Sequence, residues 1–292
     1  MREGSALKLR MGEITGGEAR ALYARRPVVL LPLGSHEDQG PHAPMGDYLL
    51  AELVAERIAR AACETGTETV VAPVLPFGKA DFFGAMPGGI ALSGKAFGLV
   101  LTEMIEALLR HGLDRIVVLN GHGGNAPVIH DVTQGFMLAG RGVFPCFYLW
   151  KVAGALLPEV IGAERARLAA GHGADPLGSI ALHLTPERMR MDLVPAERAA
   201  AGTCLGLPFM GWGAVSFEGT EINVPAEYDG PSPDGVGTGD PRLCSAETGR
   251  ALVERLVAIG AGFVRHYAGH GPASAGSEAA GCARQESRPE PL

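Results

Sequence analysis

Side chains that could bind a metal ion or move a proton gather in three polar segments, each of which follows an apolar run. They are His36, Glu37, Asp38, His42 and Asp47 in the first segment, His122 and Asn125 in the second, and His172 and Asp175 in the third. Carboxylate oxygens and imidazole nitrogens, with no thiolate among them, suit zinc or manganese in a hydrolytic site. A divalent metal there would lower the pKa of a bound water to about 7 and polarise a carbonyl group.

The second segment is the most typical setting for a metal ligand. His122 lies among glycines in the run Asn-Gly-His-Gly-Gly-Asn at residues 120–125, directly after the apolar run 115–119. The apolar run predicts a buried strand, and glycine allows a tight turn and the close approach of a ligand. Strand-to-helix turns are also rich in glycine for geometry alone, so a structural role for this histidine stays open.

The first segment also admits a simpler interpretation, in which its polar side chains cap a helix or face solvent. Asp47 directly precedes a predicted helix, where aspartate is a natural N-cap. His36, Glu37 and Asp38 alone would form an ordinary polar turn. Spacing alone therefore leaves both the metal site and the capping role open.

Strands and helices must alternate around these segments to bring them together. Apolar runs predict strands over residues 27–33, 69–74, 115–119 and 143–150. Helical spacing predicts helices over residues 17–25, 48–63, 94–111, 126–140, 152–170, 180–184 and 245–267. The alternation predicts an α/β fold, a single-domain three-layer sandwich whose mostly parallel sheet is flanked by helices. The carboxyl ends of parallel strands share one edge, so the three polar segments can converge there.

Three stretches have no clear periodicity. Residues 79–94 form a Gly-, Phe- and Met-rich loop whose apolar side chains favour a pocket wall. Residues 200–240 are rich in glycine and proline and predict an extended flap, with Trp212 and Phe217 as its aromatic anchors. Residues 269–292 have the composition of a disordered tail. We therefore expect one domain over residues 1–268, followed by that tail.

The composition limits the classes of function. The 292 residues carry a formal net charge of −7 at pH 7, which gives no basic field for nucleic acid. No apolar run reaches the ~18 residues of a membrane helix, and the start, Met-Arg-Glu-Gly, lacks an apolar signal core. Five cysteines without a C-x-x-C pair argue against a disulfide framework and a cysteine zinc site. These features predict a cytoplasmic protein with no nucleic-acid or membrane partner.

Several segments resemble the motifs of one family, in the family's order. Residues 34–47, Gly-Ser-His-Glu-Asp-Gln-Gly-Pro-His-Ala-Pro-Met-Gly-Asp, resemble the first motif of the creatininase family of metal-dependent amidohydrolases. Residues 120–125 resemble its second motif and residues 172–179 its third. Residues 86–93 are similar to its phenylalanine-proline-glycine-threonine loop, and residues 235–250 to its C-terminal pattern. The resemblance spans residues 10–268.

The resemblance implies a parallel α/β domain, a divalent metal, and hydrolysis of a non-peptide C–N bond such as that of a cyclic amide, lactam or formamide. It also implies a small-molecule substrate and a homo-oligomer, commonly a hexamer. Glu37, Asp47 and His122 match metal ligands, with Asp47 at the position that bridges two ions. His172 matches a histidine that passes protons to the leaving nitrogen, so catalysis would depend on His172 and Glu37.

The sequence departs from the family pattern where a second ion would bind. Gln39 stands at the position of a histidine ligand. Residues 177–179, Leu-Gly-Ser, replace the family's Glu-Thr-Ser, and the alternative acid two residues after His122 is Gly124. The usual acid for the second ion is therefore absent at both places, and either one or two ions of zinc or manganese would fit.

Other residues could take the missing ligand positions. The spacing from the first-motif glutamate to its aspartate is one residue short, which would allow His36 and Asp38 to act as ligands instead. Asp175 or His42 could also substitute. The altered site leaves two alternatives to hydrolysis: a metal-dependent enzyme that forms or isomerises an amide, and a catalytically silent binding protein, because fold does not dictate function.

Overall fold

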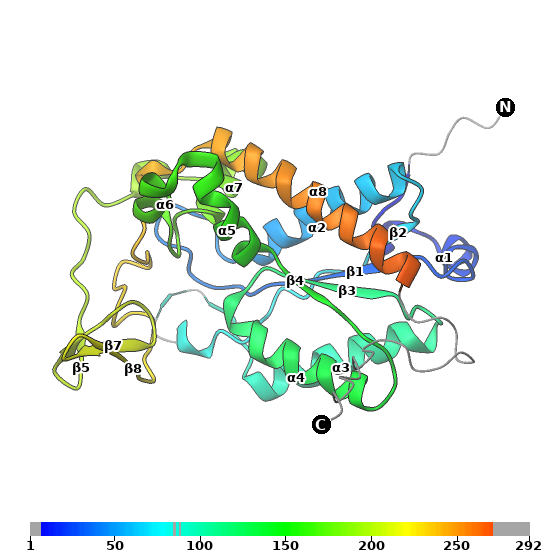
Figure 1. Ribbon diagram of the computed structural model, residues 1–292, viewed down its shortest axis with the longest axis horizontal. Coiled ribbons are helices and arrows are strands. Elements are labelled where there is room, and N and C mark those ends of the chain that lie inside the picture. The colour runs from blue at the N-terminus through cyan, green and yellow to red at the C-terminus, as the bar shows by residue number, and fades with distance from the viewer. Residues whose placement is uncertain (1–6, 84–85, 88, 271–292) are drawn as a thin grey trace, which may run out of the picture.

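The predicted strands form one parallel sheet. A computed structural model describes residues 7–83, 86–87 and 89–270 (Figure 1). Its four strands lie in the order β2-β1-β3-β4, with bounds Thr69–Val71, Val28–Leu33, Ile116–Asn120 and Cys146–Tyr148. The register sets Leu33 opposite Asn120 and Asn120 opposite Tyr148, and all pairings are parallel. The carboxyl ends of β1, β3 and β4 therefore share one edge.

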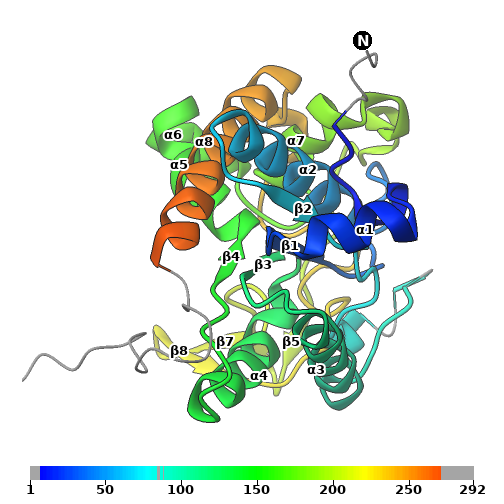
Figure 2. The ribbon, with the colours of Figure 1, turned by 90° about the vertical axis from the view of Figure 1, so that its right-hand side faces the viewer.

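Helices cover both faces of this sheet, which gives the three layers that the sequence predicts (Figures 1 and 2). One outer layer contains α2 (Tyr48–Glu64), α5 (Leu149–Ile161), α7 (Leu177–Leu184) and α8 (Ala246–His270). The other contains α3 (Gly94–Arg110) and α4 (Ala126–Leu138). Successive strand residues point to opposite faces of the sheet. Leu30 packs in the core formed with α2 and α8, and Leu31 packs in the core formed with α3.

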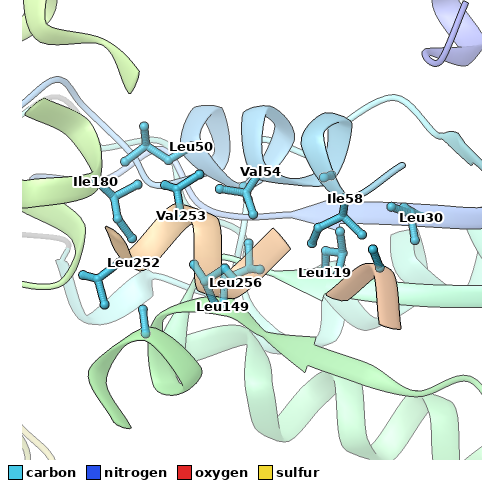
Figure 3. Close-up of a cluster of buried hydrophobic side chains, with 14 of the residues drawn as sticks. Leu30, Leu50, Val54, Ile58, Leu119, Leu149, Ile180, Leu252, Val253 and Leu256 are labelled. Atoms are coloured by element: carbon cyan, nitrogen blue, oxygen red, sulfur yellow. The ribbon is translucent and has the colours of Figure 1, made fainter. Parts of the chain in front are cut away.

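The core between α2 and α8 fixes the larger outer layer to the sheet. Figure 3 shows Val253 and Leu256 of α8 on the same side of the sheet as Val54 and Ile58 of α2. The two helices touch at Gly260, where an added Cβ would lie 2.5 Å from Ile58 Cδ1. Burying one such aliphatic side chain contributes about 1.5–3 kcal/mol. This packing holds α2, which directly follows the first polar segment, against the sheet.

Several predicted element boundaries are wrong. The strand predicted over 69–74 ends at Val71, and the helix predicted over 180–184 begins at Leu177. The strand predicted over 143–150 ends at Tyr148, and Leu149 begins α5 instead. The helix predicted over 152–170 is two helices, because Gly162 has a φ of +84° between α5 and α6 (Ala163–Ala169). A left-handed φ is favourable only for glycine and interrupts the helix. The third polar segment consequently follows a separate short helix and leads into α7, which begins at Leu177.

The remaining chain consists of short elements. The flap predicted over 200–240 contains two hairpins, made of β5 (Thr203–Cys204) and β6 (Leu207–Pro208), and of β7 (Ala214–Phe217) and β8 (Thr220–Asn223). The first helix is α1 (Gly16–Tyr23). Short 3-10 turns are Met11–Glu13, Asp81–Phe83, Gly123–Asn125, Pro186–Arg188, Met191–Leu193 and Pro241–Leu243.

The predicted tail starts within the last helix. α8 continues through Gly269 and His270, which the sequence assigned to the tail, and residues 271–292 lie outside the described part of the chain. Within the described residues, no helix is both long enough and apolar enough to cross a membrane.

Candidate metal centre

Three donor atoms from distant parts of the chain converge at the carboxyl edge of the sheet. They belong to Glu37 after β1, Asp47 before α2 and His122 after β3, and they lie within 4.8 Å of one another. His122 Nδ1 lies 2.9 Å from Glu37 Oε2 and 3.1 Å from Asp47 Oδ2. All three side chains are buried, with 2–3% of each residue exposed. Two carboxylates and one imidazole that share a point out of water form a typical binding site for a divalent cation.

Each carboxylate of this trio turns one oxygen inwards and has the other hydrogen-bonded to the protein. Gln39 Nε2 donates to Glu37 Oε1 at 2.9 Å. The Ser35 amide donates to Asp47 Oδ1 at 2.8 Å, and Asp47 makes no side-chain cap to α2. Asp47 therefore occupies the predicted N-cap position of α2, but its side chain binds at the trio and does not cap the helix. Glu37 Oε2 is buried and receives no aligned hydrogen bond within the described residues, although His122 Nδ1 is close to it.

The protonation of the imidazole is set from outside the trio. His122 Nε2 lies 3.1 Å from the Lys79 carbonyl oxygen, which can only accept, so Nε2 carries a proton. In the neutral ring Nδ1 then presents a lone pair to two carboxylates. That arrangement is unfavourable unless a proton or a metal cation lies between these atoms. The donor set therefore fits a divalent ion.

Burial and the mutual charges of the three side chains shift the pKa values of the trio. Burial raises the pKa of Glu37 to about 8 and also raises the pKa of Asp47. Burial lowers the pKa of His122, but Glu37 and Asp47 outweigh that effect and raise it to about 10. Without a metal cation, the trio therefore holds a proton on His122 at neutral pH.

Glycine and asparagine in the second segment bring the Lys79 carbonyl to the imidazole. A Cβ at Gly124 would collide with this carbonyl and lie 2.6 Å from His122 Nε2. Asn125 Oδ1 accepts from the Lys79 amide at 2.8 Å, and Asn125 Nδ2 donates to the Gly34 carbonyl at 3.1 Å. Asn125 thus holds the loops after β1, β2 and β3 together, and no acid can occupy position 124 without moving Lys79.

His172 lies in the third polar segment and faces the same cavity. Its Nε2 donates to the Asp38 carbonyl at 2.7 Å, which leaves Nδ1 as the unprotonated nitrogen. Its ring packs against Phe83 and Tyr228, with centroids 5.1 and 4.7 Å away. Burial lowers the pKa of His172 to about 4, so the imidazole is neutral at pH 7.

A cavity of about 700 Å³ joins these groups. Glu37, Asp47, His122 and His172 all line it. Aromatic side chains form part of its wall, namely Phe82, Phe83, Tyr148, Trp150, Phe209, Trp212 and Tyr228. Trp212 packs on Phe82 at 4.4 Å between centroids, which brings the flap to the 79–94 loop as a cavity wall. Phe217, the other predicted anchor, is 51% exposed.

Comparison with known proteins identifies the family. A family model described as creatininase, creatinine amidohydrolase, matches residues 12–264. The chain belongs to the creatininase family. Its sequence departures at positions 39, 124 and 177 make it a divergent member.

Its relatives in the creatininase family have more than one activity. The mycofactocin precursor peptide peptidase of Mycobacterium ulcerans (strain Agy99) is 27% identical over 254 residues, which cover 85% of this chain and 88% of that protein. The creatinine amidohydrolase of Pseudomonas putida is 33% identical over 126 residues, 41% of this chain and 46% of that protein. A solved structure of creatininase with Mn has a TM-score of 0.69 at 23% identity and covers 89% of this chain and 98% of that one, which shows the shared fold.

The other residues predicted as ligands lie outside the three-donor group of this creatininase-family chain. His36 lies beside the Tyr48 ring, 6.0 Å between centroids, and Asp38 Oδ1 accepts from the Gly40 amide at 2.8 Å. Asp175 Oδ1 accepts from the Ser179 amide at 3.2 Å. His42 is 1% exposed, and neither ring nitrogen is hydrogen-bonded within the described residues.

Two residues at the cavity were missed by sequence analysis. Tyr148, the last residue of β4, lines the cavity, and its hydroxyl lies 2.9 Å from the position of a Cβ at Gly123. Its position at the carboxyl end of a parallel strand, where ligands bind, could have predicted this. Arg198 donates to the carbonyls of Val236 and Gly237 at 2.6 and 2.8 Å, and the Gly237 amide donates to His172. No local pattern links these positions.

Proposed function

We propose that this chain is a metal-dependent amidohydrolase that cleaves a non-peptide C–N bond of a small molecule, such as a cyclic amide, lactam or formamide. The observation that carries the proposal is the buried convergence of Glu37 Oε2, Asp47 Oδ2 and His122 Nδ1 at the cavity that also contains His172. Membership of a family with hydrolytic relatives supports the same class of reaction.

Zinc or manganese fits the donor set of two carboxylates and one imidazole. When bound, such an ion would polarise the substrate carbonyl and lower the pKa of a water molecule. Glu37, Asp47 and His122 would hold it, and the creatininase structure with Mn supports manganese as one choice. The Lys79 carbonyl keeps His122 Nδ1 free to bind, because it holds the ring proton on Nε2.

His172 supplies the proton chemistry in this proposal. Its Nδ1 is unprotonated, and its lowered pKa keeps it neutral at pH 7, so it can accept a proton as water attacks. The same nitrogen then donates that proton to the leaving nitrogen. The Asp38 carbonyl holds the ring through Nε2, so only Nδ1 takes part.

A peptide substrate is the second candidate, and the cavity favours it. Its volume of about 700 Å³ and its aromatic walls can contain a group much larger than a single small ring. The relative from Mycobacterium ulcerans carries the name of a peptide peptidase. The same metal ligands and His172 would serve a peptide bond, so only the substrate separates the two candidates.

Hydrolysis assays of the manganese- or zinc-loaded full chain test the proposal. The panel contains creatinine, lactams, formamides and short peptides with aromatic ends. We expect turnover that a chelator abolishes and that Glu37→Gln loses, while His130→Gln on the exposed face of α4 retains it. His172→Gln should lower kcat by about 10²–10⁴-fold. Activity that survives both the chelator and Glu37→Gln would contradict the proposal.

A further inference from the structure

The two carboxylates of the metal centre have few atoms available for a second ion. Asp47 Oδ1 accepts from the Ser35 amide at 2.8 Å. The Gly34 backbone packs so closely against this oxygen that an added Cβ would lie 2.6 Å from it. Asp47 Oδ1 therefore faces the backbone of the loop after β1, and Asp47 presents a single oxygen, Oδ2, to His122. A bridge that uses one carboxylate oxygen for each of two cations needs both oxygens, and Asp47 turns only one to the site.

Gln39 restricts Glu37 in the same way. Its side-chain amide is buried, with 2% of the residue exposed, and lines the cavity next to Glu37. Gln39 Nε2 donates to Glu37 Oε1 at 2.9 Å, so the side chain turns towards Glu37 its amide nitrogen, which has no lone pair available for a metal. The bond also leaves Oε2 as the one oxygen of Glu37 that points to His122.

The other ligand side chains of the cavity wall form no second group of three within the described residues. Within the described residues, Glu37, Asp47 and His122 are the one group of three or more ligand side chains. Leu177, which also lines the cavity, has no donor atom. His172, whose Nδ1 is unprotonated, and Asp175, whose Oδ1 accepts from the Ser179 amide, also line the cavity, but they belong to no group of three ligand side chains. Each member of the trio thus turns one donor atom to the same place.

We infer that this centre binds a single divalent ion, and that Gln39 is a positioning residue that holds Glu37 in the orientation for that ion. The inference goes beyond the proposed function, although it rests on it for the presence of a metal. Three protein ligands leave coordination positions open towards the cavity, which is the usual arrangement of a catalytic single-metal site. A hydrogen-bond donor outside the ligands fixes the orientation of one of them.

Metal counting on the full chain tests the inference without a substrate. The protein is stripped with a chelator, loaded with excess Mn²⁺ or Zn²⁺, freed of loosely bound metal by gel filtration, and analysed by elemental mass spectrometry. We expect one ion per chain and, with Mn²⁺, a spin-resonance spectrum of uncoupled ions. Two tightly bound ions, or a spin-coupled pair, would overturn the inference and leave the proposed function standing. No bound ion would instead contradict the proposed function itself.

The role of Gln39 is tested by a substitution that removes the Nε2 hydrogen-bond donor and leaves a side chain of nearly the same size. Gln39→Leu should weaken metal affinity by about 10–100-fold, as loss of an outer hydrogen bond to a ligand typically does. The matched control is Gln134→Leu on the exposed face of α4, which should leave affinity unchanged. Circular dichroism and the melting temperature of the metal-free forms verify folding. Unchanged affinity in a folded Gln39→Leu protein would refute the positioning role.

Discussion

His122 shows how one hydrogen bond decides what a side chain can bind. The Lys79 carbonyl fixes the proton on Nε2, and the two carboxylates then draw a cation to Nδ1. In the metal-free protein that cation is a proton, because Glu37 and Asp47 outweigh burial and raise the pKa of His122 to about 10. The metal must therefore displace a proton when it binds near neutral pH.

This displacement is measurable. Calorimetric titration of metal into the stripped protein at pH 7, in buffers of different ionisation enthalpy, should give an apparent binding enthalpy that changes with the buffer. The slope should correspond to release of at least one proton, because burial raises the pKa of Glu37 as well. An enthalpy independent of the buffer would show that His122 is unprotonated at pH 7 and contradict the raised pKa.

His172 predicts a pH dependence of stability. Its pKa is about 4 in the folded chain, lowered chiefly by burial, and near 6.5 when unfolded. Between these values the unfolded chain binds a proton that the folded chain does not. The free energy of unfolding therefore falls as pH decreases from about 6.5 to about 4, by up to about 3 kcal/mol. His172→Gln should remove this part of the decrease.

Urea unfolding at pH 7.5 and pH 4.5 measures the effect. His172→Gln should lose less stability between these pH values than the wild type, whereas the exposed control His130→Gln should follow the wild-type profile. Equal losses in the wild type and His172→Gln would show that His172 is not the buried neutral group described here.

The contact of α7 with α8 positions the third polar segment. α7 directly follows His172 and Asp175, and the Ser245 amide at the start of α8 donates to Ser179 Oγ of α7 at 2.9 Å. The backbones meet at Gly249, where an added Cβ would collide with the Ser179 carbonyl. Gly262, in the same helix, has no atom within 4 Å of such a Cβ. These two glycines give a matched pair.

Gly249→Ala should lower the free energy of unfolding by about 1–3 kcal/mol, the cost of overpacking. Gly262→Ala should raise it by about 0.5–1 kcal/mol, because alanine is the better helix former. Thermal and urea unfolding of both variants measure the difference. If Gly249→Ala were as stable as Gly262→Ala, the close α7–α8 contact would be wrong.

Sequence patterns predicted the elements that carry strong periodicity. The strand at Val28–Leu33 and the helix at Tyr48–Glu64 lie within one residue of their predicted bounds, because apolar spacing alone specifies them. The convergence of Glu37, Asp47 and His122 followed from the shared edge of a parallel sheet. The hairpins of the flap were missed, since strands of two to four residues are too short for a periodic signal.

Other parts of the site depend on contacts that no local pattern encodes. The bond from Gln39 to Glu37 depends on side-chain orientations, and Arg198 reaches carbonyls about forty positions away. Whether His36 and Asp38 or Glu37 and Asp47 face His122 depends on the path of the loop after β1. The structure places Glu37 and Asp47 there, whereas spacing left both pairs open.

At the scale of the whole molecule, the metal centre links β1, α2 and β3, so a bound ion should stabilise the fold. A ligand at 100 times its Kd adds about 2.7 kcal/mol to the free energy of unfolding when the unfolded chain does not bind it. Thermal unfolding with and without Mn²⁺ should show this gain in the wild type and not in Glu37→Gln. An equal shift in both proteins would indicate that metal binds elsewhere. The predicted cytoplasmic location and hexamer stay predictions.

The most direct test is a crystal of the full chain grown with excess Mn²⁺ and measured at a wavelength where manganese scatters anomalously. We expect one anomalous peak within bonding distance of Glu37 Oε2, Asp47 Oδ2 and His122 Nδ1. A map with no peak among these three atoms, or with the ion held by His36 and Asp38 instead, would contradict this expectation.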